Sequence, residues 1–337
     1  MSDASAGRDG DLSRRALNVL EFFGELVILH LHILLVTIEA FLTWMIPSFL
    51  RSKSLEGETM LITGAGSGIG RLFALKFSAL GVRVVLWDIN ASAVEETAKI
   101  VRVNGGKAWW YTCDVTKMEE VNETAQRVRE EVGDVTMLIN NAGIVTGRYF
   151  QDLKEEDYQR TMNVNSLAHA WTLKAFLPHM LERNHGHIVT VASIMGELVI
   201  PGLSDYCMSK FAAIALHDSL LREVRAQRKD GIHFTLVNPY KIDTGMFDGA
   251  RIKKSAELLF PTLKPEYVAD KVVEAVQTNT DVVRTPFIFN IVVVISKILP
   301  LKAVLLLEDF AGNEKAMKTF VGRRGQNAVE QAVTTIE

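Results

Sequence analysis

The chain has 337 residues, of which 48% are hydrophobic, and a formal net charge of −3. The length is above that of an average single domain, and the apolar share is ample for a well-packed core. The small negative charge offers no broad basic surface, so nucleic acid is excluded as the expected partner. The two cysteines, Cys113 and Cys207, lie far apart in the sequence and predict unpaired thiols in a reducing compartment.

The first hydrophobic segment covers residues 16–46 and ends at Pro47. It follows residues 1–13, which are small, polar and charged and predict a disordered tail. As a helix the hydrophobic segment would be roughly 45 Å long, which is enough to cross a bilayer with some tilt. No small-residue cleavage site lies near its end, so a removed signal peptide is not expected. The segment is therefore predicted to be a membrane anchor.

Several polar residues of this segment fall within one sector of a helical wheel. They are Glu21, Glu25, His32, Glu39 and Thr43. A polar stripe suits a helix that lies in the membrane interface, or a spanning helix whose striped face meets protein. The alternative is a buried amphipathic helix of a soluble domain. The apolar remaining faces, and the basic residues on both flanks, favour the membrane.

From residue 57 the pattern changes to short apolar runs that alternate with helical stretches. Strands are expected at 60–62, 82–87, 108–112, 135–139, 187–191 and 233–237. Helices are expected at 71–80, 91–103, 121–131, a long stretch up to about 183, and 203–228. This alternation predicts an α/β fold with a doubly wound, Rossmann-like parallel sheet, preceded by the N-terminal membrane helix.

A second hydrophobic stretch begins after residue 280. Residues 287–299 are almost continuously apolar, and 301–307 follow Pro300. The stretch is too short and interrupted for a membrane span. We interpret it as a second interfacial helix or a cover over an apolar substrate site, with ordinary core packing as the alternative. The predicted division is a tail and anchor (1–55), a central α/β domain (56–285) and a hydrophobic extension with a polar tail (286–337).

Glycines cluster where the first strand meets the first helix, in Thr63-Gly64-Ala65-Gly66-Ser67-Gly68-Ile69-Gly70. Glycine permits a sharp turn and a close approach of the backbone to a pyrophosphate. The helix that follows offers free N–H groups and the positive end of its dipole. Because the glycines stand at a strand-to-helix junction, they predict a dinucleotide site. The expected contacts in the loop are Gly64, Ser67, Gly68, Ile69 and Gly70.

Asp88 closes the second expected strand, eighteen residues after Gly70. A carboxylate at this position can hydrogen-bond both hydroxyls of the adenosine ribose and repels a 2′-phosphate. The sequence therefore predicts NAD rather than NADP as cofactor. No lysine or arginine lies inside the glycine loop, although Arg71 and Arg83 are nearby. The alternative for Asp88 is a turn residue at the end of a strand.

Tyr206 and Lys210 lie one helical turn apart and therefore share one face of the expected helix. A phenol is a weak base near neutral pH, and a neighbouring ammonium is expected to lower its pKa. Ser193 ends a strand thirteen residues before Tyr206 and could hold a substrate oxygen. Together with the nucleotide loop, these residues predict that Tyr206 exchanges a proton with an alcohol while the cofactor exchanges a hydride.

The chain resembles the short-chain dehydrogenase/reductase family over about residues 57–285. The motifs that carry this resemblance are the loop at 63–70, Asn140-Asn141-Ala142-Gly143, Asn163-Val164-Asn165, Ser193, Tyr206 and Lys210. The resemblance implies that Asn165 completes the catalytic set and anchors a water that links Lys210 to bulk solvent.

The same resemblance implies cofactor contacts outside the glycine loop. Tyr206 and Lys210 are among the residues that would make them. Asp114 would contact adenine, Asn141 would support the adenosine ribose and the sheet, and Thr244 would meet the nicotinamide amide. The chain carries Pro239-Tyr240 where family members usually carry Pro-Gly. That departure puts the local backbone near the nicotinamide in question. The histidines offer no metal site.

Several stretches are similar to one membrane-bound subgroup, which contains retinol dehydrogenases, retinal reductases and 17β-hydroxysteroid dehydrogenases. They are residues 87–90, 143–147, 174–178, 205–207 and 263–266. The subgroup implies an N-terminal anchor, residence at the endoplasmic reticulum membrane or lipid droplets, a catalytic domain in the cytosol, and a homodimer or related heterodimer.

The leading expectation is NAD-dependent oxidation of a lipophilic alcohol, with retinol as the first candidate. A high cellular ratio of NAD to NADH favours the oxidative direction. A steroid or another lipid alcohol, and retinal reduction, remain open as alternatives. A nucleotide-bound partner at the membrane, with chemistry secondary, is the alternative from another class of function. Substrate selection is expected in residues 240–265 and in the hydrophobic C-terminal run.

Overall fold

The computed structural model of the chain describes residues 3–322, which divide at Ser52–Lys53 into two compact units. The first unit consists of helices α1 (Asp3–Met45) and α2 (Ser48–Arg51). Within α1, Leu17–Thr43 form a 27-residue stretch of mean hydropathy 2.1 with none of its most apolar part buried. By length and composition this stretch is able to cross a membrane.

Helix α1 begins at Asp3, so the described part of the expected tail, residues 3–13, is helical rather than irregular. Extending an existing helix is far easier than starting one, and this corrects the prediction for the tail. The helix ends before Pro47, as expected, because proline disfavours helical backbone at the preceding residue.

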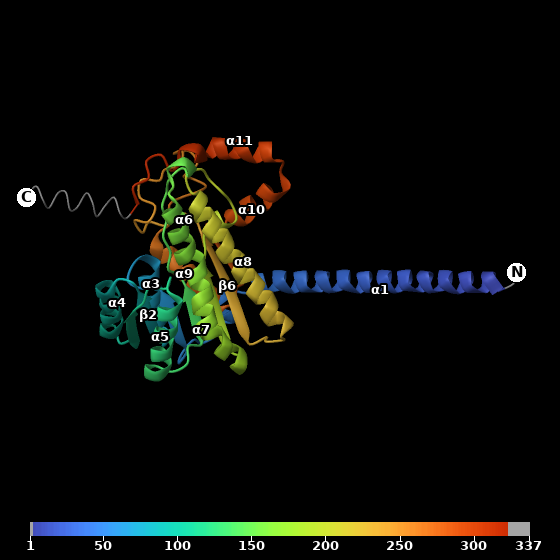
Figure 1. Ribbon diagram of the computed structural model, residues 1–337, viewed down its shortest axis with the longest axis horizontal. Coiled ribbons are helices and arrows are strands. Elements are labelled where there is room, and N and C mark those ends of the chain that lie inside the picture. The colour runs from blue at the N-terminus through green and yellow to red at the C-terminus, as the bar shows by residue number, and fades with distance from the viewer. Residues whose placement is uncertain (1–2, 323–337) are drawn as a thin grey trace, which may run out of the picture. The chain divides into compact units, whose positions relative to one another are not determined.

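The second unit is built on a parallel sheet of seven strands in the order β3-β2-β1-β4-β5-β6-β7 (Figure 1). The strands are β1 (Thr59–Thr63), β2 (Arg83–Asp88), β3 (Ala108–Thr112), β4 (Met137–Asn140), β5 (Gly186–Val191), β6 (Ile232–Pro239) and β7 (Val282–Thr285). Chain order reverses between β1 and β4, which leaves a crevice at the carboxyl ends of these strands. The prediction of a doubly wound α/β fold is confirmed, with β7 as a strand beyond the six expected.

Helices cover both faces of the sheet. They are α3 (Gly68–Ser78), α4 (Ala91–Val103), α5 (Met118–Glu131), α6 (Glu155–Met162), α7 (Ala168–Arg183), α8 (Ser204–Ala226) and α9 (Pro265–Gln277). One core joins Phe73 and Phe77 of α3 to Val272 of α9, and a second packs Trp87 of β2 against Phe176 of α7. Both cores are fully buried, so the sheet ends are held at fixed positions.

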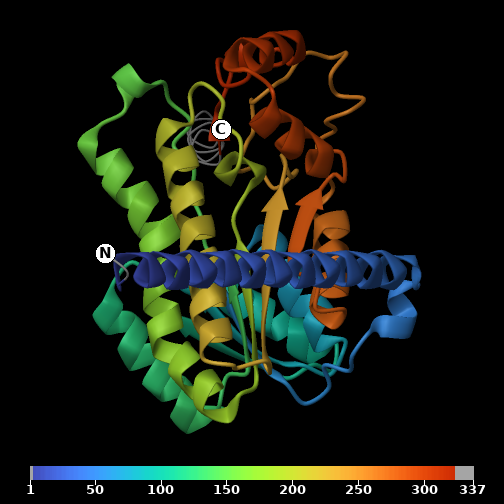
Figure 2. The ribbon, with the colours of Figure 1, turned by 90° about the vertical axis from the view of Figure 1, so that its right-hand side faces the viewer.

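The C-terminal hydrophobic stretch forms two helices, α10 (Phe289–Ile298) and α11 (Leu301–Ala311). Figure 2 shows them, in red, beyond the arrowheads of β6 and β7. Phe289 is the only fully buried residue of α10, and α11 has none. The alternative of ordinary core packing therefore holds only for Phe289 and its neighbours at the start of α10, and the interpretation as a cover agrees with the position of the remaining stretch.

Candidate active site

The glycine loop connects β1 to α3 through backbone that requires glycine. Gly64 and Gly68 have φ angles of +66° and +55°, which residues with a Cβ rarely adopt. A Cβ on Gly70 would lie 2.2 Å from the carbonyl oxygen of Gly64. Ser67 forms the N-cap of α3 and is exposed, and Ile69 in the first turn is half-buried.

Asp88 is hydrogen-bonded to this loop. Its Oδ2 accepts from the backbone N–H of Gly66 at 2.8 Å, and its Oδ1 accepts from that of Asn90 at 2.9 Å. A Cβ on Gly66 would lie 2.9 Å from Asp88 Oδ2, so glycine is needed to bring the carboxylate this close. Asp88 thus belongs to the loop as well as to the end of β2.

The loop fits a nicotinamide dinucleotide. Gly64, Gly66 and Gly70 pack so closely on neighbouring protein atoms that none has room for a Cβ, and this leaves bare backbone at the start of α3. The first turn of α3 carries no acidic residue, so the positive end of its dipole is available to a pyrophosphate. The residues that would hold the cofactor therefore match its chemistry at the phosphates and, through Asp88, at the ribose.

Asn141 fixes the loop from the neighbouring strand. Its Nδ2 donates to the carbonyl oxygen of Thr63 at 2.9 Å and to that of Gly64 at 3.3 Å. Its backbone N–H donates to Thr63 Oγ1 at 3.0 Å. Asp114, expected near adenine, accepts from the hydroxyl of Thr116 at 2.7 Å and is half-buried. Both residues lie at the carboxyl edge of the sheet, where the cofactor contacts were expected.

Tyr206 and Lys210 lie in the first turns of α8, and both are buried. Lys210 Nζ donates to the carbonyl oxygen of Val191 at 3.1 Å and lies 5.7 Å from the centre of the Tyr206 ring. Burial lowers the pKa of Lys210 to about 8. Burial raises the pKa of Tyr206, and a hydrogen bond with Ser193 opposes that rise. The pKa of Tyr206 is therefore raised and not lowered as the sequence predicts, with desolvation as the largest cause.

Ser193 follows β5 and caps the short 3₁₀ turn Ile194–Gly196. Its Oγ accepts from the backbone N–H of Met195 at 3.1 Å and lies 3.4 Å from the carbonyl oxygen of Pro239. The cap orients the hydroxyl toward Tyr206. The hydrogen bond between the two side chains acts to lower the pKa of Tyr206. The structure therefore brings Ser193 and Tyr206 together, as the sequence predicts.

Asn165 lies in a π-helical turn, Asn163–Leu167, between α6 and α7 rather than in one regular helix. Its Oδ1 accepts from the N–H of Ile144 at 2.8 Å, and its Nδ2 donates to the carbonyl of Ile144 and to Ser209 Oγ. A Cβ on Gly143 would lie 3.5 Å from Asn165 Oδ1 and 3.6 Å from Lys210 Nζ. Asn165 and Lys210 therefore meet at Gly143.

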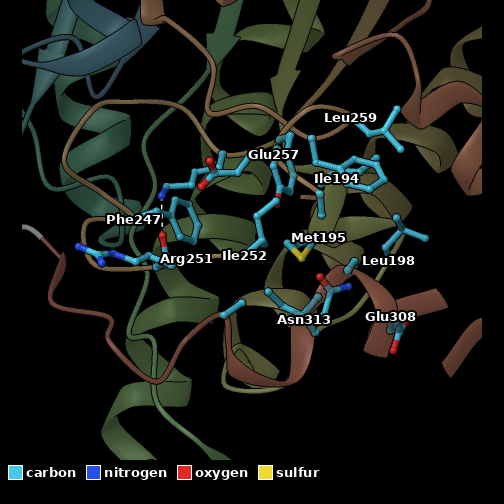
Figure 3. Close-up of a pocket in the computed structure, with 18 of the residues that line it drawn as sticks. Ile194, Met195, Leu198, Phe247, Arg251, Ile252, Glu257, Leu259, Glu308 and Asn313 are labelled. Atoms are coloured by element: carbon cyan, nitrogen blue, oxygen red, sulfur yellow. Dashed lines mark hydrogen bonds between the residues drawn. The ribbon is translucent and has the colours of Figure 1, made fainter. Parts of the chain in front are cut away.

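A cavity of about 990 Å³ lies next to Ser193. Figure 3 shows residues that line it. Ser193 lines it, and Phe247, another lining residue, packs edge-on against Tyr206 with ring centres 5.6 Å apart. Three segments supply most of the remaining wall: 194–200, 247–260 and 304–317. The wall is mostly apolar, so the cavity suits a lipophilic ligand with one polar group near Ser193.

Tyr240, which stands where family members usually carry glycine, faces this cavity. Its ring packs against Phe289 with centres 5.0 Å apart and against Phe260 at 6.3 Å. Its backbone N–H donates to the carbonyl oxygen of Thr285 at 2.8 Å. The tyrosine thus extends the apolar wall and fastens the start of α10 without disturbing the end of β6. Thr244 follows in a turn, where its N–H donates to the carbonyl of Ile242 at 2.9 Å.

The start of α10 is held by an ion pair as well. Glu197 Oε2 accepts from Arg284 Nε at 2.8 Å, and Arg284 donates to Asn290 Oδ1 at 3.1 Å. The glutamate follows the 3₁₀ turn that Ser193 caps. The turn beside Ser193, strand β7 and helix α10 are therefore connected by one set of polar contacts.

Residues 58–255 match the short chain dehydrogenase family. Retinol dehydrogenase 10-B of Danio rerio is 46% identical over 297 residues, which cover 82% of this chain and 88% of that protein. The chain belongs to the short-chain dehydrogenase family. Oxidoreductase chemistry on alcohols follows from this membership.

Solved structures of short-chain dehydrogenases share the fold. An enzyme from Burkholderia phymatum in complex with NAD has a TM-score of 0.66 and 26% identity, covering 76% of this chain and 96% of that one. An alcohol dehydrogenase from Thermococcus sibiricus, complexed with 5-hydroxy-NADP, has a TM-score of 0.60 and 26% identity, covering 67% and 95%. The two relatives thus hold different nicotinamide dinucleotides on the same fold.

Some residues at this site of the short-chain dehydrogenase were not singled out from the sequence. They are the lining segment 194–200, directly after Ser193, and Gly143, which was named only as part of a motif and lies between Asn165 and Lys210. Position gives a signal for the first group, because residues that follow a strand at the carboxyl edge reach the substrate crevice. Among the described residues, no group of three or more histidine, cysteine or acidic side chains could hold a metal ion.

We expect the buried Lys210 to make stability depend on pH. Its folded pKa of about 8 lies below the ordinary lysine pKa of 10.5, so the unfolded chain binds more protons between these values. The stability of the wild-type protein relative to Lys210→Met should therefore rise with pH over this window, by up to roughly 3 kcal/mol. Thermal unfolding of both proteins from pH 7 to 10.5 measures this.

Lys107→Met, which removes an exposed ammonium, serves as the control for that comparison. A stability difference for Lys210→Met that does not change with pH would contradict a buried, titrating lysine.

Proposed function

We propose that the chain is a membrane-associated, NAD-dependent dehydrogenase that oxidises all-trans-retinol to retinal. The observation that carries the proposal is that Ser193 lines an apolar cavity, while the buried Tyr206 packs against Phe247 of the same wall and lies beside the buried Lys210. The identity of 46% to a protein named as a retinol dehydrogenase supports retinol as substrate. The cavity has ample volume for a lipophilic alcohol, whose hydroxyl would lie at Ser193.

In the proposed reaction, Ser193 Oγ holds the alcohol oxygen by a hydrogen bond, and Tyr206 Oη takes the hydroxyl proton. The bound cofactor supplies the hydride acceptor for the carbinol carbon. The wall around Phe247 and Met195 excludes water from the reacting atoms. The electron pair of the O–H bond becomes the second bond of the carbonyl, and the pair of the C–H bond leaves with the hydride. The proton is then on Tyr206.

Lys210 and Asn165 would carry that proton away. The ammonium of Lys210 stabilises the phenolate of Tyr206 electrostatically, and Asn165 lies next to it across Gly143. The side chain of Asn165 is held at both ends by Ile144, so its position is fixed. Gly143, with no side chain, leaves room between the two groups for a water that passes the proton outward.

Gly143→Ala tests this arrangement. The added methyl group would contact Asn165 Oδ1 and Lys210 Nζ at ordinary van der Waals distances, so the fold should tolerate it. It would occupy the room for the water, and we expect kcat to fall by about tenfold to a hundredfold with little change in Tm. Steady-state kinetics and thermal unfolding measure the two effects. Unchanged kcat in a folded variant would rule out a proton route past Gly143.

NAD is proposed over NADP because Asp88 lies where the adenosine ribose would bind. Its carboxylate repels a 2′-phosphate. The nearest arginine, Arg71, is already engaged: it donates to the carbonyl of Gly66 at 2.8 Å, to Thr97 Oγ1 at 3.0 Å and to Glu96 at 2.9 Å. Arg71 would have to leave these partners to meet a phosphate, which favours the unphosphorylated cofactor.

Membrane association is proposed from helix α1, whose stretch Leu17–Thr43 is exposed and long enough to span. The family resemblance supports the endoplasmic reticulum membrane or lipid droplets as its location, with the second unit in the cytosol. A membrane would also hold a substrate that dissolves in lipid, so anchor and cavity agree in chemistry.

The decisive experiment is a substrate screen with the full-length protein in membranes, using NAD and NADP separately. Retinol, a set of steroids and long-chain fatty alcohols are compared by their kcat/KM values. Highest kcat/KM for retinol with NAD supports the proposal. Preference for a steroid would change the substrate, and activity only with NADP or only toward retinal would overturn the oxidative, NAD-dependent assignment.

A further inference from the structure

Helices α10 and α11 present a continuous apolar face to the outside of the second unit. Both helices are too short to span a membrane. Their exposed apolar residues are Ile291, Val294, Ile295, Ile298, Leu301, Leu305, Leu306, Leu307 and Phe310. An apolar face of this extent marks an interaction surface in a folded protein.

The same helices form a wall of the cavity from their other side. Val292, Val304 and Ala311 line the cavity, and Ile295 and Leu307 reach both the cavity and the outside. A single layer of apolar side chains therefore separates the cavity from the exterior. Whatever covers the outer face also covers the route into the cavity.

The segment 251–262 continues this surface. Leu258 has 89% of its surface exposed and Leu259 53%, and Leu259 also lines the cavity. Lys253, from the same segment, lies 5.0 Å from the centre of the Phe310 ring of α11 and hydrogen-bonds the carbonyl of Ala311 through its backbone. The segment and α11 are therefore side by side. We define the docking surface as α10, α11 and residues 251–262.

The charges of the docking surface favour lipid headgroups. Its five cations outnumber its three acidic residues: Arg251, Lys253, Lys254, Lys297 and Lys302 against Glu257, Glu308 and Asp309. Lysine and arginine around an apolar face are typical of segments that lie in a membrane interface, where their stems pack on lipid and their charges meet phosphates. Glu308, the acidic residue of α11 that lines the cavity, has its pKa raised by burial.

The chain also keeps the second unit near a bilayer. The apolar stretch of α1 ends at Thr43 and the second unit begins at Lys53. The residues between them reach at most about 30–35 Å. If α1 spans the membrane, as proposed above, the second unit stays within that reach of lipid, where even weak binding is strongly favoured.

We propose that α10, α11 and residues 251–262 dock in the plane of a phospholipid bilayer, so that the cavity exchanges its alcohol with the lipid phase directly. This step rests on the proposed membrane association. Leu306 and Ile298 then lie below the headgroups, and the cations of the surface lie among the phosphates. A lipophilic substrate enters between α10, α11 and the 251–262 segment without crossing water.

The test places a fluorescent reporter on the surface of the full-length protein. Leu306→Cys is labelled with a nitrobenzoxadiazole maleimide, and the protein is reconstituted in phosphatidylcholine vesicles with some phosphatidylserine and nitroxide-labelled lipid. Val103→Cys on α4 is the matched control, because Val103 is 78% exposed and Leu306 is 69% exposed. The native Cys113 and Cys207 are buried and do not react in the folded protein.

We expect blue-shifted emission and several-fold stronger nitroxide quenching at position 306 than at position 103. Equal, weak quenching at both positions would overturn the proposal, and a blue shift without lipid quenching would assign the surface to a second copy instead. This readout needs no turnover, so it is independent of the substrate assignment. The double variant Ile298→Glu, Leu306→Glu should raise KM at least fivefold for the alcohol supplied in vesicles. Its KM for the alcohol supplied on a cyclodextrin carrier should be unchanged. Equal KM values of the variant and the wild type in vesicles would contradict direct entry from lipid.

Discussion

Tyr206→Phe is expected to lower kcat/KM for retinol by about a hundredfold to ten-thousandfold, the range that a positioned acid–base group contributes. The substitution removes only the hydroxyl, and the ring contact with Phe247 at 5.6 Å is kept. The variant should therefore fold and bind the cofactor as the wild type does. Initial rates in membranes, together with cofactor binding by fluorescence, separate lost chemistry from lost binding.

Tyr267→Phe is the matched control for that experiment. Tyr267 lies on α9 with 40% of its surface exposed, so the loss of its hydroxyl should leave the rate unchanged. If Tyr206→Phe retained the wild-type rate, or the cellular role of the protein survived this change, the role of Tyr206 as the proton acceptor would be lost. The alternative of a nucleotide-bound partner without catalysis would then be preferred.

Asp88→Asn is expected to change the cofactor preference. The wild-type enzyme should use NAD with at least a hundredfold higher kcat/KM than NADP. Replacing the carboxylate by an amide weakens charged hydrogen bonds to the ribose and removes the repulsion of a 2′-phosphate. We expect kcat/KM with NAD to fall by about tenfold to a hundredfold, since hydrogen bonds to charged groups contribute about 1.5–3 kcal/mol. The value with NADP should rise.

The amide keeps one oxygen that can accept from the N–H of Gly66, and the exposed N–H of Asn90, which loses its carboxylate partner, can bond to water instead, so the loop should remain folded. Asp134→Asn weakens only surface contacts, with Arg183 and His179, and should change neither cofactor value. If kcat/KM fell in equal proportion with NAD and with NADP, the substitution would have damaged the loop and not changed the choice of cofactor. A wild-type enzyme that prefers NADP would remove the basis of the prediction.

The fold was predictable because local patterns and the global architecture agree. Apolar runs at 60–62 and 82–87 became β1 and β2, and the glycine loop stands between β1 and α3 as expected. Strand β7 was missed because it has only four residues and contains Arg284, and a run this short gives little periodic signal in the sequence although its burial alternates. The part of the site that the sequence predicted best consists of residues in sharp turns at the ends of strands.

Other parts of the site depend on packing that no local pattern reports. The pKa of Tyr206 depends on how deeply its phenol is buried, which the spacing to Lys210 does not contain. The meeting of Asn165 and Lys210 at Gly143 joins three distant segments of the chain. Tyr240 looked like a departure near the nicotinamide, and its role in the aromatic wall depends on Phe289, which lies about fifty residues later.

The π-helical turn at Asn163–Leu167 has a consequence for how this enzyme can vary in length. A π turn contains one residue more than the α-helical turn that it replaces. Deleting Ser166 would let α6 and α7 join as one regular helix, and would rotate α6 by about 100° relative to α7. Asn165 would then leave both Ile144 and Ser209. The position of Asn165, the proposed catalytic asparagine, thus depends on the number of residues around it, and a deletion in this turn should be as damaging as a substitution of Asn165 itself.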